Sequence, residues 1–212
     1  MTVCKLCKST DVQSISPPKD NRTYFLCNHC KLIFVSPEFF PSRIAEINRY
    51  LEHENAISNK GYVDFLNRVI QPAVTYLTHD MTCLDYGCGH TPVLSELLRQ
   101  QGYTCYNYDP LFGFEHPFNQ YDLIFATESF EHFFDPAKDL NTLCRLLKPK
   151  GYLAIMTEQW ESIDRFNAWY YKRDHTHVSF YHMETMEYIC QSFGFEVVHK
   201  DKNRVIILKR IN

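Results

Sequence analysis

Hydrophobic and polar positions recur in two different rhythms along residues 60–212. Apolar runs of strand length occur at residues 81–85, 104–109, 122–126 and 152–157. Stretches with apolar residues at helical spacing occur at residues 61–77, 92–101, 136–147 and 184–193. Because strands and helices follow each other in turn, this part of the chain is predicted to form a doubly wound α/β domain, with a mostly parallel sheet and helices on both faces.

Local signals mark the ends of several of these elements. Asp135 and Pro136 are typical of an N-cap followed by proline at the first helical position. Gly194 is typical of a residue that ends a helix. Near the end of the chain, residues 195–199 and 204–209 alternate between apolar and polar positions, which predicts an antiparallel pair of strands.

The segment before this domain has a different character. Residues 37–59 have weak helical spacing and several polar side chains. We expect this segment to be a linker with lid helices. It would join an N-terminal unit, residues 1–36, to the main domain, residues 60–212.

Four of the nine cysteines lie in the N-terminal unit. Cys4, Cys7, Cys27 and Cys30 form two Cys-x-x-Cys pairs that are separated by residues 8–26. Zinc prefers four soft ligands in a tetrahedron, and two such pairs joined by a hairpin supply them. A segment this short can hardly bury enough apolar surface without a metal. We therefore predict a structural four-thiolate zinc knuckle. A redox pair is the less favoured alternative, because no helical pattern follows either pair.

The charge balance narrows the range of partners. The formal net charge of −3 at pH 7 gives the chain no general attraction to nucleic acid or to an anionic membrane. No apolar run approaches the length of a membrane span. Cys4, Lys5 and Cys7 interrupt the start of the chain, which does not resemble a signal or transit peptide. We expect a cytoplasmic protein without a membrane partner.

The knuckle itself has a mild basic bias that leaves two interpretations open. It could contact an RNA phosphate, or it could be a solvated surface that packs on the main domain. The residues that create the bias are Lys5, Lys8, Lys19, Arg22 and Lys31, against Asp11 and Asp20.

A glycine-containing loop follows the first strand of the main domain. Gly87 and Gly89 would let the backbone pass close to a ligand, and Asp109 ends the next strand, where a carboxylate can accept both hydroxyls of a ribose. The third glycine of a dinucleotide fingerprint would fall at Pro92. Asp85, just before the glycines, would repel a diphosphate but would suit a ligand with an ammonium group. These residues predict a nucleoside cofactor. A domain for another nucleotide, or a degenerate fold that binds nothing, is the alternative.

The run Leu84-Asp85-Tyr86-Gly87-Cys88-Gly89 resembles the first motif of class I S-adenosylmethionine-dependent methyltransferases. Asp109 matches their ribose-binding acid, and residues 121–132 and 146–153 match later motifs in order and spacing. Lys150 stands where a glycine is usual, which is a minor departure. The resemblance covers about residues 60–212 and implies a Rossmann-like sheet of seven strands. From their place at the start of this domain, Tyr50, His53 and Tyr62 could form part of a lid over the cofactor. The cofactor-binding residues that the resemblance implies are Asp85, Tyr86, Gly87, Cys88, Gly89, Asp109, Pro110 and Thr127.

Two carboxylates and an imidazole follow the strand at 122–126. Glu128, Glu131 and His132 have the spacing i, i+3, i+4, so one helical turn would place all three on one face. Such a set is part of a coordination shell for a divalent cation. The alternative is a loop anchor, in which Glu131 caps and His132 bonds the backbone.

A later segment is dense in aromatic and histidine residues. Asp174-His175-Thr176-His177 resembles the Thr-His segment of ubiquinone-pathway O-methyltransferases and, more loosely, a segment of small-RNA 2′-O-methyltransferases. That resemblance implies a second, divalent metal held by Glu128, Glu131, His132 and His177, with His175 in reserve. The alternative for the two later histidines is a hydrogen-bonded lid segment.

The candidate catalytic residues are His132, His177 and Glu128. A metal beside them would lower the pKa of an acceptor hydroxyl, and without a metal either imidazole could act as a general base. The acceptor pocket could be walled by Trp160, Trp169, Tyr170 and Tyr171, which could equally serve only to pack their segment on the sheet.

Three functions remain open on the sequence. The first is an enzyme that methylates a small molecule, at an oxygen, with or without a divalent metal. The second is an RNA-modifying methyltransferase that docks through the knuckle, and the third is a non-catalytic zinc-knuckle interaction protein. The absence of a long basic run in the sequence favours the first over the second.

Overall fold

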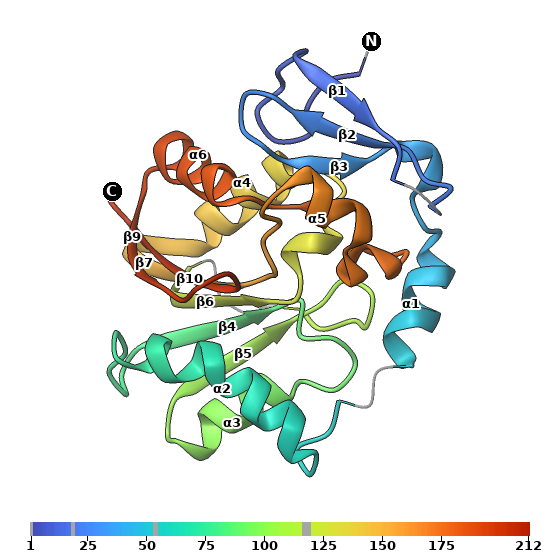
Figure 1. Cartoon of the computed structure of the whole chain (residues 1–212). Helices are drawn as coiled ribbons and strands as arrows, with labels where there is room; N and C mark the ends of the chain where they lie inside the picture. Colours follow the sequence, from blue (N-terminus) through green and yellow to red (C-terminus); the bar gives the residue numbers. More distant parts are fainter. Residues whose placement is uncertain (1, 18–19, 53–54, 116–119) are drawn as a thin grey trace.

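The computed structural model describes residues 2–17, 20–52, 55–115 and 120–212. Its main sheet has six strands within these ranges, in the order β5-β4-β6-β7-β10-β9 (Figure 1). The strands are β4 (Thr82–Tyr86), β5 (Thr104–Tyr108), β6 (Tyr121–Thr127), β7 (Leu147–Met156), β9 (Phe195–Lys200) and β10 (Val205–Arg210). Strands β4 to β7 are parallel, and β10 runs antiparallel to both of its neighbours.

This arrangement confirms the predicted doubly wound, mostly parallel sheet, but the count of seven strands is wrong. The missing strand would lie beside β5, which is instead an edge. The connection from β5 to β6 spans only residues 109–120. Because one parallel crossover alone needs a dozen or more residues, this connection has no room for a further strand with a crossover on either side.

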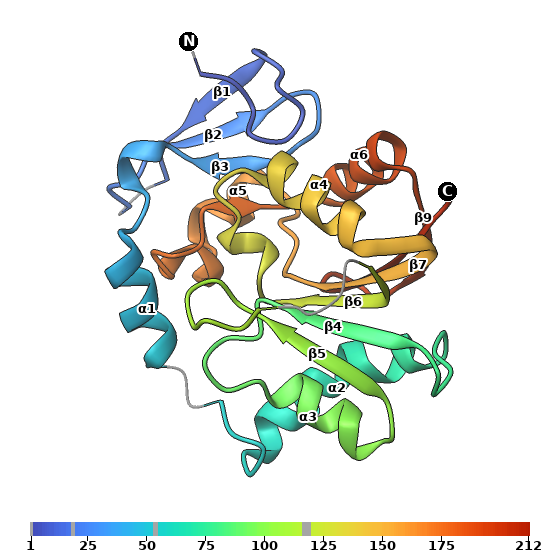
Figure 2. The same ribbon diagram turned by 180° about the vertical axis from the view of Figure 1, so that it is seen from behind.

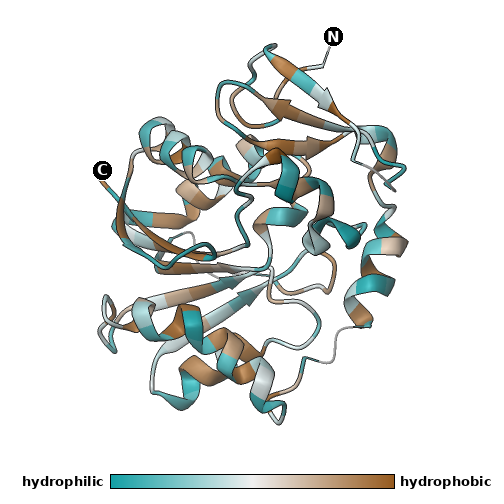
Figure 3. Cartoon of the chain, in the orientation of Figure 1, coloured by the Kyte–Doolittle hydropathy of each residue, from teal (hydrophilic) through white to brown (hydrophobic). Residues whose placement is uncertain are grey.

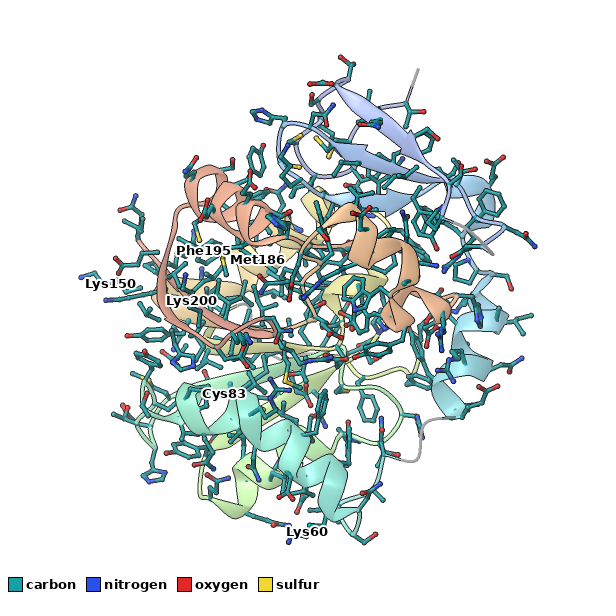
Figure 4. The ribbon with its side chains drawn as sticks, in the orientation of Figure 1. Lys60, Cys83, Lys150, Met186, Phe195 and Lys200 are labelled. Carbon is teal, nitrogen blue, oxygen red and sulfur yellow. The ribbon has the colours of Figure 1, made fainter. Side chains whose placement is uncertain are left out.

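Helices cover both faces of the sheet (Figures 1 and 2). On one face lie α2 (Lys60–Val74) and α3 (Val93–Gln100), and on the other lie α4 (Pro136–Leu146) and α6 (Met183–Phe193). Successive residues of a strand point to opposite faces, so Leu123 and Phe125 of β6 pack with α2 and α3, whereas Ile124 packs with α4 and α6. Figure 4 shows one residue from each core, Cys83 of β4 beside α2 and Met186 of α6 across the sheet.

The helix boundaries follow from ordinary capping. Asp135 accepts a hydrogen bond from the backbone N–H of Lys138 at 3.3 Å, which is the predicted N-cap of α4. Gly194 ends α6 with a φ of 75°. Figure 3 shows hydrophobic and hydrophilic residues side by side on α2 and α3, as amphipathic helices require. No helix in the described part of the chain is long and apolar enough to cross a membrane.

The N-terminal residues form a second, antiparallel sheet. It consists of β1 (Val12–Ile15), β2 (Tyr24–Cys27), β3 (Ile33–Val35) and β8 (Ser179–Phe180), in that order. Strand β8 comes from the C-terminal half of the chain, so the knuckle and the main domain share this sheet. Leu32 and Phe34 of the knuckle are buried in the same core as α4 and α6.

The remaining elements connect these layers. Helix α1 (Arg43–Leu51) crosses from the knuckle towards α2 at one side of the molecule (Figure 1). The segment after β7 contains α5 (Ile163–Ala168) and the short 3₁₀ helix η3 (Tyr170–Arg173). Two further 3₁₀ helices are η1 (Pro37–Phe39), which follows β3, and η2 (Phe130–His132), which follows β6.

Candidate functional site

A cavity of about 800 Å³ opens at the carboxyl ends of β4, β5 and β6. This size is typical of sites for small ligands and cofactors. The cavity is walled by the residues that follow these three strands and is bounded by α1 and α2. It brings together seven of the predicted cofactor residues: Tyr86, Gly87, Cys88, Gly89, Asp109, Pro110 and Thr127.

The loop after β4 is shaped by its two glycines. Gly87 and Gly89 have φ values of +81° and +67°, where a residue with a side chain would be strained. A Cβ on Gly87 would lie 2.8 Å from the Cβ of Ser129, whereas a Cβ on Gly89 would meet no atom within 4 Å. The backbone at Gly89 therefore faces open space in the cavity, where a ligand can approach it closely.

Asp109 binds this loop to the end of β5. One of its carboxylate oxygens accepts the backbone N–H of Gly89 at 3.0 Å, and the other accepts the N–H of Leu111 at 2.9 Å. Each oxygen keeps a further lone pair, so the carboxylate can still accept ligand hydroxyls. Its position on the cavity wall fits the predicted contact with a ribose.

Asp85 is the predicted cofactor residue that does not reach the cavity wall. It is 3% exposed and lies beneath the loop. Burial raises the pKa of its carboxyl to about 7, although a hydrogen bond from the backbone N–H of Ser95 opposes this rise. Asp85 therefore supports the first turn of α3 from below rather than presenting a charge to the ligand.

A second group of side chains meets at the far side of the cavity. Glu131, His132 and His177 each offer a ligand atom, and these atoms all lie within 4.8 Å of one another. We call these three residues the triad. Its members come from η2 and from the segment before β8, which are distant in sequence, and their donor atoms suit zinc, manganese or iron(II).

Hydrogen bonds behind the triad orient its donor atoms. Nδ1 of His132 lies 3.0 Å from the carbonyl of Thr176, and Nδ1 of His177 lies 2.6 Å from the carbonyl of Tyr171. A carbonyl can only accept, so each Nδ1 carries the proton and each Nε2 keeps its lone pair. Carbonyl partners of this kind are typical of histidines that ligate metals.

The Glu131 carboxylate is held in the same way. It is fully buried, and its two oxygens accept hydrogen bonds from the hydroxyls of Thr157, at 2.8 Å, and of Tyr171. Burial raises the pKa of Glu131 to about 7 and lowers the pKa of His132 and His177 to about 4 and 3. Both imidazoles are therefore neutral at physiological pH.

Glu128 is not part of this group. The predicted helical turn through residue 128 does not form, because η2 begins only at Phe130 and Glu128 has a φ of 48°. Its two carboxylate oxygens instead lie 3.0 and 3.1 Å from Nη1 of Arg204. The other terminal nitrogen of Arg204, Nη2, binds Glu158 at 2.6 Å. The positive φ that separates Glu128 from the next turn has no signal in the sequence.

The predicted lid and acceptor residues have mixed positions. Tyr50 and Tyr62 line the cavity, and the Tyr50 ring lies edge-on to His132 at 5.1 Å, whereas His53 is outside the described residues. His175 is exposed and is not in the triad. A separate, smaller cavity of about 270 Å³ is lined by Trp160, Trp169 and Tyr170, so these three do not wall the main cavity.

The predicted site residues did not include Glu46. It lies on α1, lines the cavity and is 8% exposed, and burial raises the pKa of its carboxyl to about 7. On the same helix Ile44 and Leu51 are 72% and 54% exposed. This reversed polarity, with the acid inside and the apolar residues outside, is the feature that could have drawn attention to the helix.

The four knuckle cysteines are arranged as a zinc site requires. Sγ of Cys4 lies 3.6 Å from Sγ of Cys30, and Sγ of Cys7 lies 3.4 Å from Sγ of Cys27. All four sulfur atoms lie within 4.8 Å of one another. A tetrahedron with Zn–S bonds of about 2.3 Å has S···S edges of about 3.8 Å, so the cluster fits the ion.

The turns around the cysteines repeat each other. Lys8 and Lys31, each directly after the second cysteine of a pair, have φ values of 61° and 57°. Their N–H groups donate to the carbonyls of Cys4 and Cys27 at 3.2 and 2.9 Å. Two equal turns thus present two pairs of thiols to one centre.

Comparison with known proteins identifies the family and the fold of the chain. A family model described as a methyltransferase domain matches residues 50–200. No curated protein matches the sequence. Among solved structures, the chain is similar to 1,6-didemethyltoxoflavin-N1-methyltransferase from Burkholderia thailandensis, determined with 1,6-didemethyltoxoflavin and S-adenosylhomocysteine. The identity is 10% and the TM-score 0.58, over 94% of this chain and 100% of that chain.

Two further structures have the same fold. One is a SAM-dependent methyltransferase from Archaeoglobus fulgidus, with 18% identity and a TM-score of 0.51 over 69% of this chain and 94% of that chain. The other belongs to a complex of the Haloferax volcanii Trm112 methyltransferase activator with a methyltransferase, with 14% identity and a TM-score of 0.57 over 79% and 95%. At these identities the likeness concerns the fold.

Proposed function

Because the chain belongs to the methyltransferase domain family, we propose that it moves the methyl group of S-adenosylmethionine to an oxygen of a small, uncharged or cationic acceptor, with a divalent metal at the triad. The observation that carries this proposal is the position of Glu131, His132 and His177 in the same cavity as the glycine loop and Asp109. The chain would then consist of a knuckle at residues 1–36, a linker with a lid at 37–59 and the catalytic domain at 60–212.

The cofactor would lie along the ends of β4 and β5. Gly87 and Gly89 would leave room for its methionine part, and the Asp109 carboxylate would bind the ribose. Tyr50 and Tyr62 would cover it from α1 and α2. Such a fixed position matters because the sulfonium methyl is already activated, so alignment of sulfur, methyl and acceptor supplies much of the rate.

The triad would hold the acceptor end of the reaction. A divalent cation bound there would lower the pKa of an acceptor hydroxyl and so supply the nucleophilic oxygen near neutral pH. Thr157 and Tyr171 fix the Glu131 carboxylate, and the carbonyls of Thr176 and Tyr171 fix the two imidazoles, so the three donors need no rearrangement. Burial lowers the pKa of His132 and His177 to about 4 and 3, so either imidazole would be a weak general base near neutral pH, and activation of the acceptor hydroxyl would depend on the metal.

Charge favours a small acceptor over RNA. The cavity wall carries one lysine against six acids, Glu46, Asp109, Glu128, Glu131, Asp135 and Asp139. Burial raises the pKa of Glu46 and Glu131 to about 7, of Glu128 to about 8 and of Asp139 to about 6, so the wall is acidic but carries less negative charge near neutral pH than six full carboxylates. A phosphodiester would be repelled there, whereas a cationic cofactor and a neutral or cationic acceptor would be attracted. In the knuckle, Lys8 pairs with Asp135 at 3.2 Å and Arg22 donates hydrogen bonds to carbonyls of the chain itself.

The test measures cofactor and metal binding separately. Calorimetry with S-adenosylhomocysteine should detect binding to the wild type, and Asp109→Ala should weaken it. Manganese-stimulated production of S-adenosylhomocysteine, assayed with a panel of phenols and alcohols, should be lost in Glu131→Gln and in His177→Ala. The matched control is His175→Ala, two residues away and exposed.

Two results would remove the proposal. Failure of S-adenosylhomocysteine to bind the wild type would exclude the cofactor site. Turnover that is equal in chelator and in manganese, and equal in the two triad variants, would exclude the metal. Activity on RNA but not on small acceptors would assign the chain to the RNA alternative.

A further inference from the structure

The hairpin between β1 and β2 of the knuckle reaches across to the segment that carries His177. Arg22, in this hairpin, donates hydrogen bonds to the backbone carbonyls of Lys172, Asp174 and His177, the last two at 3.4 and 3.3 Å. Three carbonyls of one short segment thus converge on one guanidinium, whose planar set of donors is suited to several acceptors at once.

The guanidinium is itself held in place. Asp20 accepts hydrogen bonds from Nε of Arg22 at 3.3 Å and from the hydroxyl of Tyr24 at 2.6 Å, and it pairs with Nζ of Lys172 at 3.2 Å. The side chains of Asp20, Arg22 and Lys172 are 12%, 13% and 8% exposed. Although burial alone would raise it, the hydrogen bonds from Tyr24 and Arg22 lower the pKa of Asp20 to about 2, so Asp20 stays ionised near neutral pH.

A second link joins the knuckle to the triad through Val178. The N–H of Val178 donates to the carbonyl of Glu131 at 2.8 Å, and its carbonyl accepts the N–H of Val35, at the end of β3, at 2.9 Å. Val178 directly follows His177, so the backbone of two triad residues and the backbone of the knuckle meet at one residue. The pairing of β3 with β8 continues this contact, with Phe34 opposite Ser179.

We infer that the knuckle is a positioning device for the triad, in which Arg22 and Asp20 hold the segment 172–178 so that His177 faces Glu131 and His132. We call Arg22 and Asp20 the clamp. This inference rests on the proposed metal role of the triad. Arg22 is a positioning residue, because it acts through the backbone of His177 and lines no part of the cavity.

This role explains why a zinc-type cluster is joined to a methyltransferase domain by a shared sheet. The four cysteines stabilise a small hairpin sheet, and the sheet carries the clamp and β3 to the rim of the site. Arg22, one of the five basic residues that left an RNA contact open, donates to three carbonyls of the chain itself. The knuckle therefore completes the acceptor side of the site, whereas the cofactor side is built without it.

The decisive variant is Arg22→Ala, compared with Arg173→Ala as the matched control. Arg173 lies in the same segment and is exposed. Manganese binding, followed by electron paramagnetic resonance, should weaken about 10–100-fold in Arg22→Ala, as for loss of groups that orient metal ligands. Hydrogen exchange should rise in peptides that cover 172–180 and stay unchanged in peptides that cover 82–89. The dissociation constant for S-adenosylhomocysteine should equal that of the wild type.

Arg22→Lys separates geometry from charge. A lysine keeps the positive charge but cannot donate to three separate carbonyls from one planar group, so it should restore little of the lost manganese affinity. Should Arg22→Ala fail to fold, Asp20→Asn tests the same network, because it removes the carboxylate that binds both Arg22 and Lys172.

The possible failures are distinct. A wild type that binds no manganese contradicts the proposed metal, and the clamp is then judged by hydrogen exchange at 172–180 alone. Unchanged exchange there in Arg22→Ala overturns the clamp. Equal loosening of residues 82–89 also overturns it, since that result would show only a general loss of stability.

Discussion

Replacing Gly87 by alanine perturbs a contact between the cofactor loop and Ser129, which follows β6 and precedes the triad residues Glu131 and His132. The new Cβ would lie 2.8 Å from the Cβ of Ser129, directly after Glu128. Gly89→Ala is the matched control, because it has a similar positive φ but its Cβ would meet no atom within 4 Å. The difference between the two variants therefore measures the contact with Ser129.

The expected loss in free energy of unfolding has two contributions. Placing alanine at the positive φ of either glycine costs about 1–2 kcal/mol. Forcing a methyl group into an occupied site costs about 1–3 kcal/mol more, because real carbon contacts lie near 3.5–4.0 Å. We expect Gly87→Ala to lower the free energy of unfolding by about 2–5 kcal/mol and Gly89→Ala by about 1–2 kcal/mol.

Urea unfolding measures these losses, and calorimetry with S-adenosylhomocysteine measures binding. Gly89→Ala should lose more affinity than stability, since its methyl group projects into the cavity. In the double variant Gly87→Ala/Ser129→Gly, compared with Ser129→Gly alone, only the backbone strain should remain. Equal unfolding free energies for Gly87→Ala and Gly89→Ala would refute the reasoning, because the Ser129 contact would then carry no cost.

Two further variants test the knuckle and the support of the loop. Cys27→Ser should lose bound zinc, measured by elemental analysis, and should lower the unfolding temperature, whereas the control Cys190→Ser should keep both; full zinc content in Cys27→Ser would exclude the four-thiolate site. Because burial raises the pKa of Asp85 to about 7, above its unfolded value, the folded state holds the extra proton, and stability should fall between about pH 4 and pH 7. Asp85→Asn should remove up to about 4 kcal/mol of this fall in stability. Urea unfolding midpoints at pH 4.5 and 7.5 measure the change. A pH profile equal to that of the wild type would contradict the argument from burial.

Local patterns in the sequence were sufficient to predict the domain and the cysteine cluster. The rhythm of apolar positions identified the alternating strands and helices, because each element needs an apolar side that faces the core. The spacing of Cys4, Cys7, Cys27 and Cys30 identified the cluster, because a tight turn brings two thiols together without help from distant residues. The loop at 85–89 and Asp109 were recognisable because each directly follows a strand that the sequence predicts.

The composition of the triad was decided at the tertiary level, whereas the number of strands follows from the short connection that the sequence leaves between the strands predicted at 104–109 and 122–126. The short connection at 109–120 leaves β5 at the edge of the sheet. The positive φ of Glu128 and its ion pair with Arg204 remove that acid from the triad. The positive φ of Glu128 has no local sequence signal, and the partner of Glu128, Arg204, lies 76 residues later in the chain, directly before β10.

The same division holds for the knuckle. The sequence determined that it carries four thiols and a basic surface, but only the folded chain shows where Arg22 points. Arg22 binds carbonyls that lie 150 to 155 residues later in the chain, in the segment that carries His177. A contact between distant segments depends on how the two sheets are joined through β8, and hydrophobic periodicity, which reports only on each element's own faces, contains no information about that joint.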